Sequence, residues 1–179
     1  MLQLESTVLV VIDVQDRLFR VMQGREALAD NLRKLISGAQ VLGIPVMLTE
    51  QNPKGLGPTI PELASLLPAA KSIPKLSFSC CSEERFLREL KALNRRQVLL
   101  AGIELHICVY QTAVDLVAAG YEVQVVADCV ATRLAENREV GLIRLREAGA
   151  CLITTEMALF ELLKTAEGDA FREINKIVK

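Results

Sequence analysis

Three side chains of reactive type stand at matching places along the chain: Asp13, Lys75 and Cys108. Asp13 ends the apolar run 8–12, Lys75 follows an Ile-Pro pair, and Cys108 lies beyond the apolar run 98–101. If these runs are parallel strands, their carboxyl ends meet at one edge of a sheet. An acid, a base and a nucleophile would then share that edge. Taken singly, they read as a turn residue, a solvated charge and a core side chain.

Cys108 stands where a strand-like segment passes into a helical one. A cysteine attacks a carbonyl carbon as the thiolate, and the exposed N–H groups at a helix start favour that anion. The same N–H groups can stabilise an oxyanion that forms after the attack. Because most free cysteines are packing residues, this stretch alone favours a core role for Cys108. Asp13 and Lys75 at matching strand ends weigh against that reading.

Apolar, β-branched runs of strand length alternate with longer segments of helical periodicity, which indicates βαβ units and a parallel sheet buried on both faces. The expected strands are Thr7–Ile12, Pro45–Thr49, Ala70–Ile73, Gln97–Ala101, Glu122–Ala127 and Cys151–Thr154. The expected helices are Arg25–Leu42, Glu83–Leu93, Ile107–Ala119, Ala135–Ala148, Thr155–Lys164 and Asp169–Val178. A length of 179 residues favours one domain over 1–179.

The segment from Glu50 to Pro74 is the longest without a regular pattern and is rich in proline and glycine. Loops of this length in a compact domain are functional or disordered, and the leucines of this one favour an ordered loop with a short helix. It leaves the carboxyl end of a predicted strand, where open parallel sheets bind ligands. We therefore expect it to form a wall of the pocket.

The composition predicts a cytoplasmic protein with a small-molecule partner. With 21 Lys and Arg against 22 Asp and Glu, the chain has no general attraction for nucleic acid or an anionic membrane. No apolar run approaches the ~20 residues of a membrane-spanning helix, and the N-terminal residues are not typical of a signal peptide. The 5 cysteines contain no C-x-x-C pair, which argues against a disulfide framework or a zinc ribbon. We expect packing roles for Cys80, Cys81, Cys129 and Cys151, with Cys80 or Cys81 the candidates for exposure.

Several stretches occur in an order that identifies a family. They are Ile12–Gln15, Lys75–Ser79, Gly102–Val109 with Gln111–Ala113, Asp128 with Val130 and Arg133, Gly149–Ala150 and Thr154–Glu156. Together they resemble the isochorismatase-like cysteine hydrolases over nearly the whole chain. Thr49–Gln51 and Gly55–Thr59 are most similar to the subgroup called isochorismatase-domain-containing proteins.

The resemblance implies a three-layer αβα sandwich around a six-stranded parallel sheet of Rossmann-like type. It also implies a triad in which Cys108 is the nucleophile, Asp13 takes its proton and returns it to the leaving amine, and Lys75 holds Asp13 ionised and favours the thiolate. Members of the family have a cis peptide at the place of Ile103–Glu104. The backbone N–H groups of Glu104 and Cys108 would form the oxyanion hole.

A departure from the family pattern bears on metals. Nicotinamidases of the family bind a metal through an Asp-x-His motif and a further histidine. This chain has Thr49–Lys54 at that place, and its single histidine is His106. The sequence therefore predicts no metal site and no cofactor, and argues against nicotinamide as the substrate. We expect a structural or pocket-rim role for His106.

The expected pocket residues come from the strand ends and the loops that follow them. Gln15 either contacts substrate or fixes the loop of Asp13, and we favour the second; Phe78 is as consistent with the core as with a ring-stacking surface. The full set of pocket candidates is Gln15, Thr49, Gln51, Leu56, Phe78 and Ile103.

These residues predict a metal-independent cysteine hydrolase that cleaves the C–N bond of a small carboxamide or related amide through a thioester. By the family resemblance it is a homo-oligomer, a dimer or larger. Two alternatives remain open at this point. One is a catalytically silent binding or interaction protein on the same scaffold, and the other is a hydrolase of a non-amide bond such as the enol ether of isochorismate.

Overall fold

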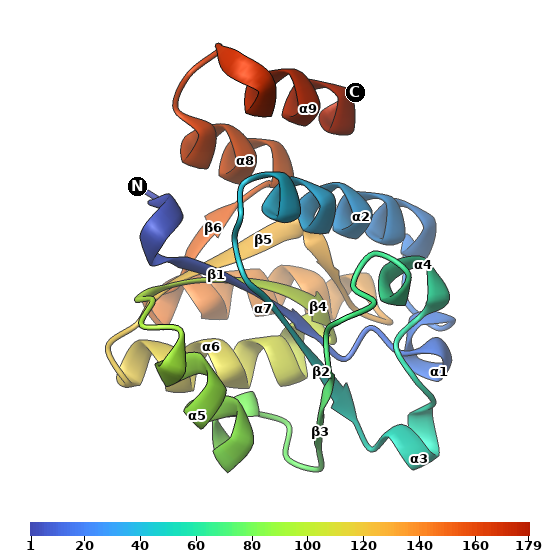
Figure 1. Cartoon of the computed structure of the whole chain (residues 1–179). Helices are drawn as coiled ribbons and strands as arrows, with labels where there is room; N and C mark the ends of the chain where they lie inside the picture. The colour runs from blue at the N-terminus through green and yellow to red at the C-terminus, as the bar shows by residue number, and fades with distance from the viewer.

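The computed structural model describes residues 1–179 and contains a six-stranded sheet in the order β3-β2-β1-β4-β5-β6. All neighbouring strands are parallel, which confirms the predicted α/β fold (Figure 1). The strands are β1 (Thr7–Ile12), β2 (Val46–Gln51), β3 (Ile73–Lys75), β4 (Gln97–Ile103), β5 (Glu122–Ala131) and β6 (Cys151–Ile153).

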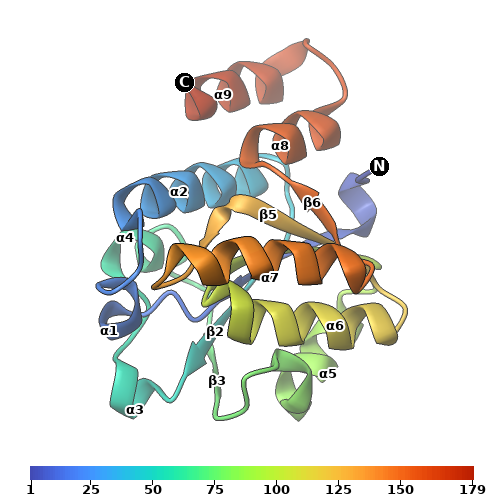
Figure 2. The same ribbon diagram turned by 180° about the vertical axis from the view of Figure 1, so that it is seen from behind.

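Helices cover both faces of the sheet. One layer contains α2 (Arg25–Val41) and α8 (Thr155–Leu163), with α9 (Gly168–Val178) packed against both of them. The opposite layer contains α5 (Glu84–Ala92), α6 (Tyr110–Ala118) and α7 (Ala135–Glu147), as Figure 2 shows. The short helical turns are η1 (Leu4–Ser6), α1 (Asp16–Phe19), α3 (Pro53–Leu56), α4 (Pro61–Ala64), η2 (Cys80–Ser82) and η3 (Leu105–Val109). No helix combines the length and apolar character needed to cross a membrane.

The sheet has an apolar core on each face, as a parallel sheet covered by two helical layers requires. Successive side chains of a strand point to opposite faces. Leu9 and Val11 of β1 therefore join the core beneath α2 and α8, whereas Val8 and Val10 join the core beneath α5, α6 and α7. Every residue of β1 is buried, which explains why positions 8–12 are continuously apolar rather than alternating.

The main errors of the sequence prediction lie at strand ends near the site. β3 is Ile73–Lys75 rather than Ala70–Ile73, so Lys75 belongs to the strand. Pro74, which predicts a strand end, is tolerated because β3 is an edge strand that pairs only with β2. β5 extends four residues beyond the predicted end to Ala131, and the helical segment after β4 begins at Leu105 rather than Ile107.

The long loop after β2 is ordered and contains α3 and α4, one turn more than the single short helix expected. Glu50 ties its two ends together. The Glu50 Oε1 atom accepts hydrogen bonds from the backbone N–H and the hydroxyl of Thr59 at 2.7 and 2.8 Å, and Oε2 accepts one from Ser72 Oγ at 2.9 Å. Leu63 of α4 is fully buried in the core.

The strand order reverses direction between β1 and β4, which lie side by side at the centre of the sheet. Open parallel sheets bind ligands beyond the carboxyl ends of the strands at such a point. Asp13 directly follows β1, and Cys108 lies in η3, the turn that follows β4. The topology therefore brings two of the predicted reactive residues to this position.

Candidate active site

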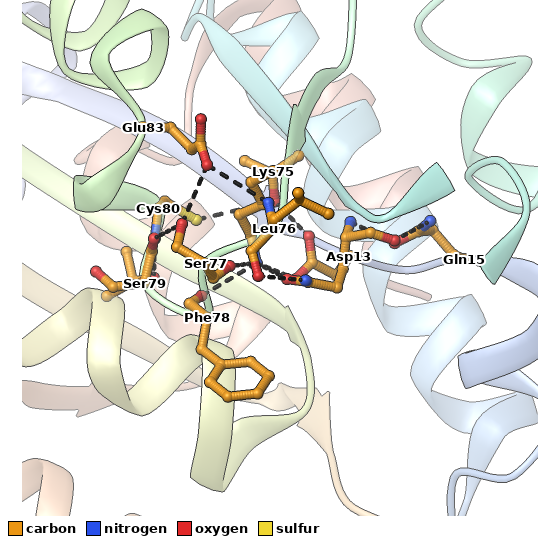
Figure 3. Close-up of polar contacts among 12 residues, drawn as sticks. Asp13, Gln15, Lys75, Leu76, Ser77, Phe78, Ser79, Cys80 and Glu83 are labelled. Carbon is orange, nitrogen blue, oxygen red and sulfur yellow. Dashed lines mark hydrogen bonds and ion pairs between the residues drawn. The ribbon is translucent and has the colours of Figure 1, made fainter. Parts of the chain in front are cut away.

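Asp13 and Lys75 meet across the end of β2, the strand between β1 and β3. Lys75 Nζ lies 2.6 Å from Asp13 Oδ2, and neither side chain is exposed (Figure 3). Asp13 has φ of 53°, an uncommon value outside glycine that aspartate tolerates better than most residues. Thr49 of β2 donates a hydrogen bond from its hydroxyl to Asp13 Oδ1 at 2.8 Å. The carboxylate is thus held from two sides.

β4 approaches β1 closely because position 102 is a glycine. Gly102 pairs with Ile12 and has φ of 117°, and a Cβ at this position would lie 2.1 Å from the Ile12 carbonyl oxygen. Any larger residue would push the two strands apart. The close approach brings the end of β4, and with it Cys108, beside Asp13.

Cys108 lies in a π-helical turn, η3, with 5% of its surface exposed. Its thiol is near enough to Asp13 and Lys75 for both charges to act on its pKa. The peptide bond between Ile103 and Glu104 is cis. The Glu104 N–H makes no hydrogen bond to another backbone group. All three predicted reactive residues therefore lie in one site.

Burial and the charges of the site act against one another. Burial raises the pKa of Asp13 above its usual range, against the opposing effects of Lys75 and Thr49. Burial alone would lower the pKa of Lys75, but the charges of Asp13 and Cys108 raise it overall. Burial, followed by the charge of Asp13, raises the pKa of Cys108 to about 12, despite the nearby Lys75. The charge of Lys75 acts in the opposite sense and lowers the pKa of Cys108, but by less than burial and Asp13 raise it. The site instead has a thiol beside a carboxylate of increased basicity.

Lys75 has further partners around its ammonium group. Nζ donates a hydrogen bond to Gln51 Oε1 at 2.8 Å. It also donates to the carbonyl oxygens of Ser77 and Phe78 at 3.1 and 3.0 Å (Figure 3). The segment after β3 therefore folds back around its own lysine. These contacts could not be predicted from the sequence, because every residue has a backbone carbonyl group and the residue type does not show where it points.

Three expected pocket residues are buried and engaged within the protein. The Gln15 amide binds the main chain of Gln51 and Gly57, and the Thr49 hydroxyl binds Asp13. Ile103 is fully buried in the core beneath α2 and α8. Gln15 therefore joins the segment after Asp13 to the loop beyond β2, in line with the structural role that we favour for it. The expectation that Thr49 and Ile103 line the pocket is corrected, because Thr49 is engaged by a hydrogen bond and Ile103 by packing.

The other pocket candidates lie nearer the surface. Gln51 and Leu56 are half-buried, and Phe78 is 53% exposed, so it is not a core residue. Figure 3 shows the Phe78 ring directed away from the pair of Asp13 and Lys75. A surface hollow of about 460 Å³ lies next to Lys75, which sequence reasoning did not find; it is lined by Asn52, Pro53, Lys54, Pro74, Lys75, Leu76 and Glu83.

The remaining cysteines divide differently from the prediction. Cys80 is fully buried near the site, where burial, followed by the charge of Asp13, raises its pKa to about 11. Cys81 is half-buried. Cys151 is exposed rather than packed, because it begins the edge strand β6. Cys129 is buried as expected.

His106 is half-buried in η3 and packs against α7, where a Cβ on Gly141 would lie 3.3 Å from the His106 Cβ. It donates no hydrogen bond to Asp13 or Cys108, and its Nδ1 atom is buried without a partner. His106 thus lies at the packing contact between η3 and α7. No three His, Cys, Asp or Glu side chains are grouped so that they could hold a metal ion.

Asp128, one of the residues that carry the family pattern, has a structural role. Its Oδ1 atom accepts hydrogen bonds from the Thr155 backbone N–H at 2.8 Å and from the Thr155 hydroxyl at 3.0 Å. Thr155 is the first residue of α8. Asp128 therefore joins β5 to the start of α8, which satisfies a backbone donor that the helix leaves free.

Comparison with known proteins places the chain in a family. The isochorismatase domain model matches residues 7–157. Isochorismatase domain-containing protein 2 of Danio rerio is 38% identical over 178 residues, which cover 99% of this chain and 89% of that protein. Among solved structures, the MAR1 ribonuclease of Caenorhabditis elegans has a TM-score of 0.92 and 33% identity, with 99% of this chain and 91% of that chain covered.

A second structure is informative about assembly. The YcaC gene product of Escherichia coli, described as an octameric hydrolase of unknown specificity, has a TM-score of 0.93 and 25% identity over 98% of this chain and 88% of that chain. The family model covers most of the chain, and the curated relative extends over nearly all of it. The chain belongs to the isochorismatase family of hydrolases.

Proposed function

We propose that the protein is a cysteine hydrolase that cleaves the C–N bond of a small carboxamide or related amide without a metal ion. The observation that carries this proposal is the proximity of Cys108 to Asp13, which is itself paired with Lys75, where β1 and β4 end. A thiol beside a carboxylate of raised pKa is a nucleophile beside a base suited to take its proton.

In the proposed reaction, Cys108 Sγ attacks the amide carbon while its proton passes to Asp13. The oxyanion that forms accepts hydrogen bonds from backbone N–H groups, among them that of Glu104. The C–N bond then breaks as Asp13 returns the proton to the leaving amine. Water, deprotonated by Asp13, attacks the resulting thioester, the C–S bond breaks, and the proton restores the Cys108 thiol. The products are a carboxylic acid and an amine.

Lys75 has an electrostatic role in this scheme. With Asp13 deprotonated, its ammonium group keeps the carboxylate charge paired in a site that solvent does not reach. When Asp13 takes the proton, the same ammonium group stabilises the charge that develops on sulfur and oxygen. Lys75 itself transfers no proton, and its raised pKa agrees with a group that stays charged.

Two features support a small, neutral substrate and a reaction without metal. The charge of the chain is -1, which gives no general attraction for nucleic acid. Residues Thr49–Lys54 lack the Asp-x-His motif of the metal-binding members of the family. Because the C. elegans relative is named a ribonuclease, RNA is the alternative substrate to test.

The test is a panel of primary and secondary carboxamides, with release of ammonia or amine as the readout. We expect wild-type protein to turn over at least one of them, and Cys108→Ala and Asp13→Asn to abolish turnover while retaining the fold. Cys151→Ala, which removes an exposed thiol, is the matched control and should keep the wild-type rate. Turnover only of an enol ether or of RNA would contradict the amide assignment. Tight binding of an amide that is not cleaved would favour a binding protein.

We also propose that the protein is a homo-oligomer. The E. coli relative is described as octameric, and α7 exposes 58% of Val140 and 49% of Ile143 to solvent. Exposed apolar side chains on one helix are typical of an interface. Sedimentation at micromolar concentration should give a dimer or a larger species, and a monomer would contradict the proposal.

A further inference from the structure

β2 extends beyond the end of its neighbour β1. The last regular pair between the two strands joins Ile12 to Thr49, and β1 then turns away at Asp13. β2 continues for two more residues to Gln51. The backbone groups of Gln51 on this side therefore have no strand to pair with, and buried backbone groups require partners.

The Gln15 side chain takes the place of the missing strand. Its Oε1 atom accepts a hydrogen bond from the Gln51 N–H at 2.7 Å, and its Nε2 donates to the Gln51 carbonyl oxygen at 3.0 Å. Nε2 also donates to the carbonyl oxygen of Gly57 at 2.6 Å. Gln15 is 0% exposed, so these bonds do not compete with water. One amide group thus reproduces the donor and acceptor of a paired strand.

The other side of Gln51 is held by β3. Gln51 pairs with Lys75 in the parallel register, and the N–H of Asn52 donates to the Lys75 carbonyl oxygen at 2.8 Å. The backbone at Gln51 is therefore fixed from both sides, by a side chain on one and by a strand on the other. The Gln51 side chain therefore extends from a backbone whose position is fixed.

The Gln51 side chain extends from this fixed point to the ammonium group of Lys75. Its Oε1 atom accepts from Lys75 Nζ at 2.8 Å, and its Nε2 donates to the carbonyl oxygen of Leu76 at 2.9 Å. The second bond turns the amide so that its oxygen faces Lys75. The contacts thus run from Gln15 through Gln51 to Lys75 and on to Asp13.

We propose that Gln51 is a positioning residue that holds the Lys75 ammonium against Asp13, and that Gln15 acts through Gln51. This inference rests on the proposed function, in which Lys75 stabilises the charge that forms at Cys108. Gln51 suits the task because a neutral amide accepts a hydrogen bond without drawing the lysine charge away from Asp13.

The two carbonyl groups that also bind Lys75 differ from Gln51 in their place in the chain. Both belong to the segment directly after Lys75, in which 77% of Leu76 and 53% of Phe78 are exposed. Gln51 belongs to the neighbouring strand β2, so its bond to Nζ fixes the ammonium group relative to that strand.

The test uses alkylation of Cys108 by iodoacetamide at mildly alkaline pH, followed by peptide mass spectrometry. It compares wild type with Gln51→Met, Gln15→Met, the double variant and Gln40→Met. Gln40 is the matched control, because its amide donates to the Leu66 carbonyl far from Lys75. We expect Gln51→Met to react about ten-fold more slowly, as for the loss of a hydrogen bond to a charged group. Gln40→Met should react at the wild-type rate.

The double variant tests whether Gln15 and Gln51 act in series on Lys75. If Gln15 acts through Gln51, the double variant should be no slower than Gln51→Met. Multiplication of the two single effects would overturn the role assigned to Gln15. A wild-type rate in folded Gln51→Met would overturn the whole inference. Because Gln51 is only half-buried, this variant remains informative even if Gln15→Met fails to fold.

Kinetics on an identified substrate separate positioning from substrate contact. A positioning role predicts that Gln51→Met lowers kcat and leaves KM unchanged, whereas an increase in KM alone would show that Gln51 contacts substrate and would overturn the inference. The alkylation readout does not depend on turnover. If Cys108→Ala kept the wild-type activity, the proposed function would be refuted. The alkylation rates of the Gln51 variants would still decide this inference separately.

Discussion

Lys75 Nζ lies 2.6 Å from Asp13 Oδ2 in a site where neither side chain reaches solvent. Such a pair is held by mutual attraction and by the hydrogen bonds around it, since both charges have lost their water. The two residues are not equivalent. Lys75 has three further acceptors, whereas Asp13 relies on Lys75 and Thr49.

This asymmetry predicts unequal effects of removing either partner. Lys75→Met leaves the Asp13 charge buried without its counterion and should lower the free energy of unfolding by about 3–5 kcal/mol. Asp13→Asn should lower the free energy of unfolding by less, because Lys75 Nζ keeps its hydrogen bonds to Gln51 and to the Ser77 and Phe78 carbonyls. Urea denaturation measures both. The exposed Lys71→Met is the control, and an equal loss in the two site variants would contradict this account.

The contact of β1 with β4 predicts a severe effect at Gly102. Gly102→Ala would place a methyl group 2.1 Å from the Ile12 carbonyl oxygen, in a backbone conformation that alanine rarely adopts. The free energy of unfolding should fall by about 4 kcal/mol through clash and strain together. Gly43→Ala also has a positive φ, but nothing lies within 4 Å of its Cβ. Gly43→Ala should lower the free energy of unfolding by only about 1 kcal/mol. Similar melting temperatures for the two variants would refute the role of Gly102.

The buried thiols predict a loss of stability at alkaline pH. In the folded protein the pKa of Cys108 is raised from 9.0 to about 12, so the unfolded chain loses this proton first. The unfolded state is then favoured as pH rises from about 9 towards 12, and the stability present below pH 9 is lost. Lys75, whose pKa is also raised, acts with the same sign.

Urea denaturation at pH 8 and pH 10 checks this prediction. Cys108→Ala should reduce the loss of stability between the two pH values by about 1 kcal/mol, the size expected for one pH unit above the unfolded pKa. Cys151→Ala, at an exposed position, should leave the loss unchanged. The same loss in Cys108→Ala and wild type would show that Cys108 is not a thiol held in a buried site.

Thiol reactivity at neutral pH should follow exposure. Cys151 is exposed, whereas Cys108 is 5% exposed and its pKa is raised to about 12. We therefore expect iodoacetamide at pH 7 to modify Cys151 before Cys108, as measured by peptide mass spectrometry over time. Faster modification of Cys108 would indicate a thiolate at rest, formed by Lys75 against the effect of Asp13.

The sequence was sufficient to predict the sheet and the three reactive residues. Both follow from periodicity and from the rule that parallel strands end at one edge. It could not predict the environment of those residues, since this depends on backbone geometry. β1 turns away at Asp13 with a positive φ, and only then does Gln15 meet the main chain of Gln51.

Burial also decides roles that residue type leaves open. Thr49 and Ile103 lie at strand ends where a pocket wall is expected, yet one binds Asp13 and the other packs in the core. The charge of Cys108 is a similar case. A lysine nearby lowers the pKa of the thiol, but burial and the charge of Asp13 raise it by more.

The most direct test of the proposed mechanism is the detection of a thioester on Cys108. Protein mixed with an amide that it hydrolyses is quenched in acid within the first turnovers, digested and analysed by mass spectrometry. The mechanism predicts the acyl group of the substrate on the peptide that contains Cys108, and no acyl group anywhere in Cys108→Ala. Steady hydrolysis by Cys108→Ala, or an acyl group on another residue of the wild type, would contradict it.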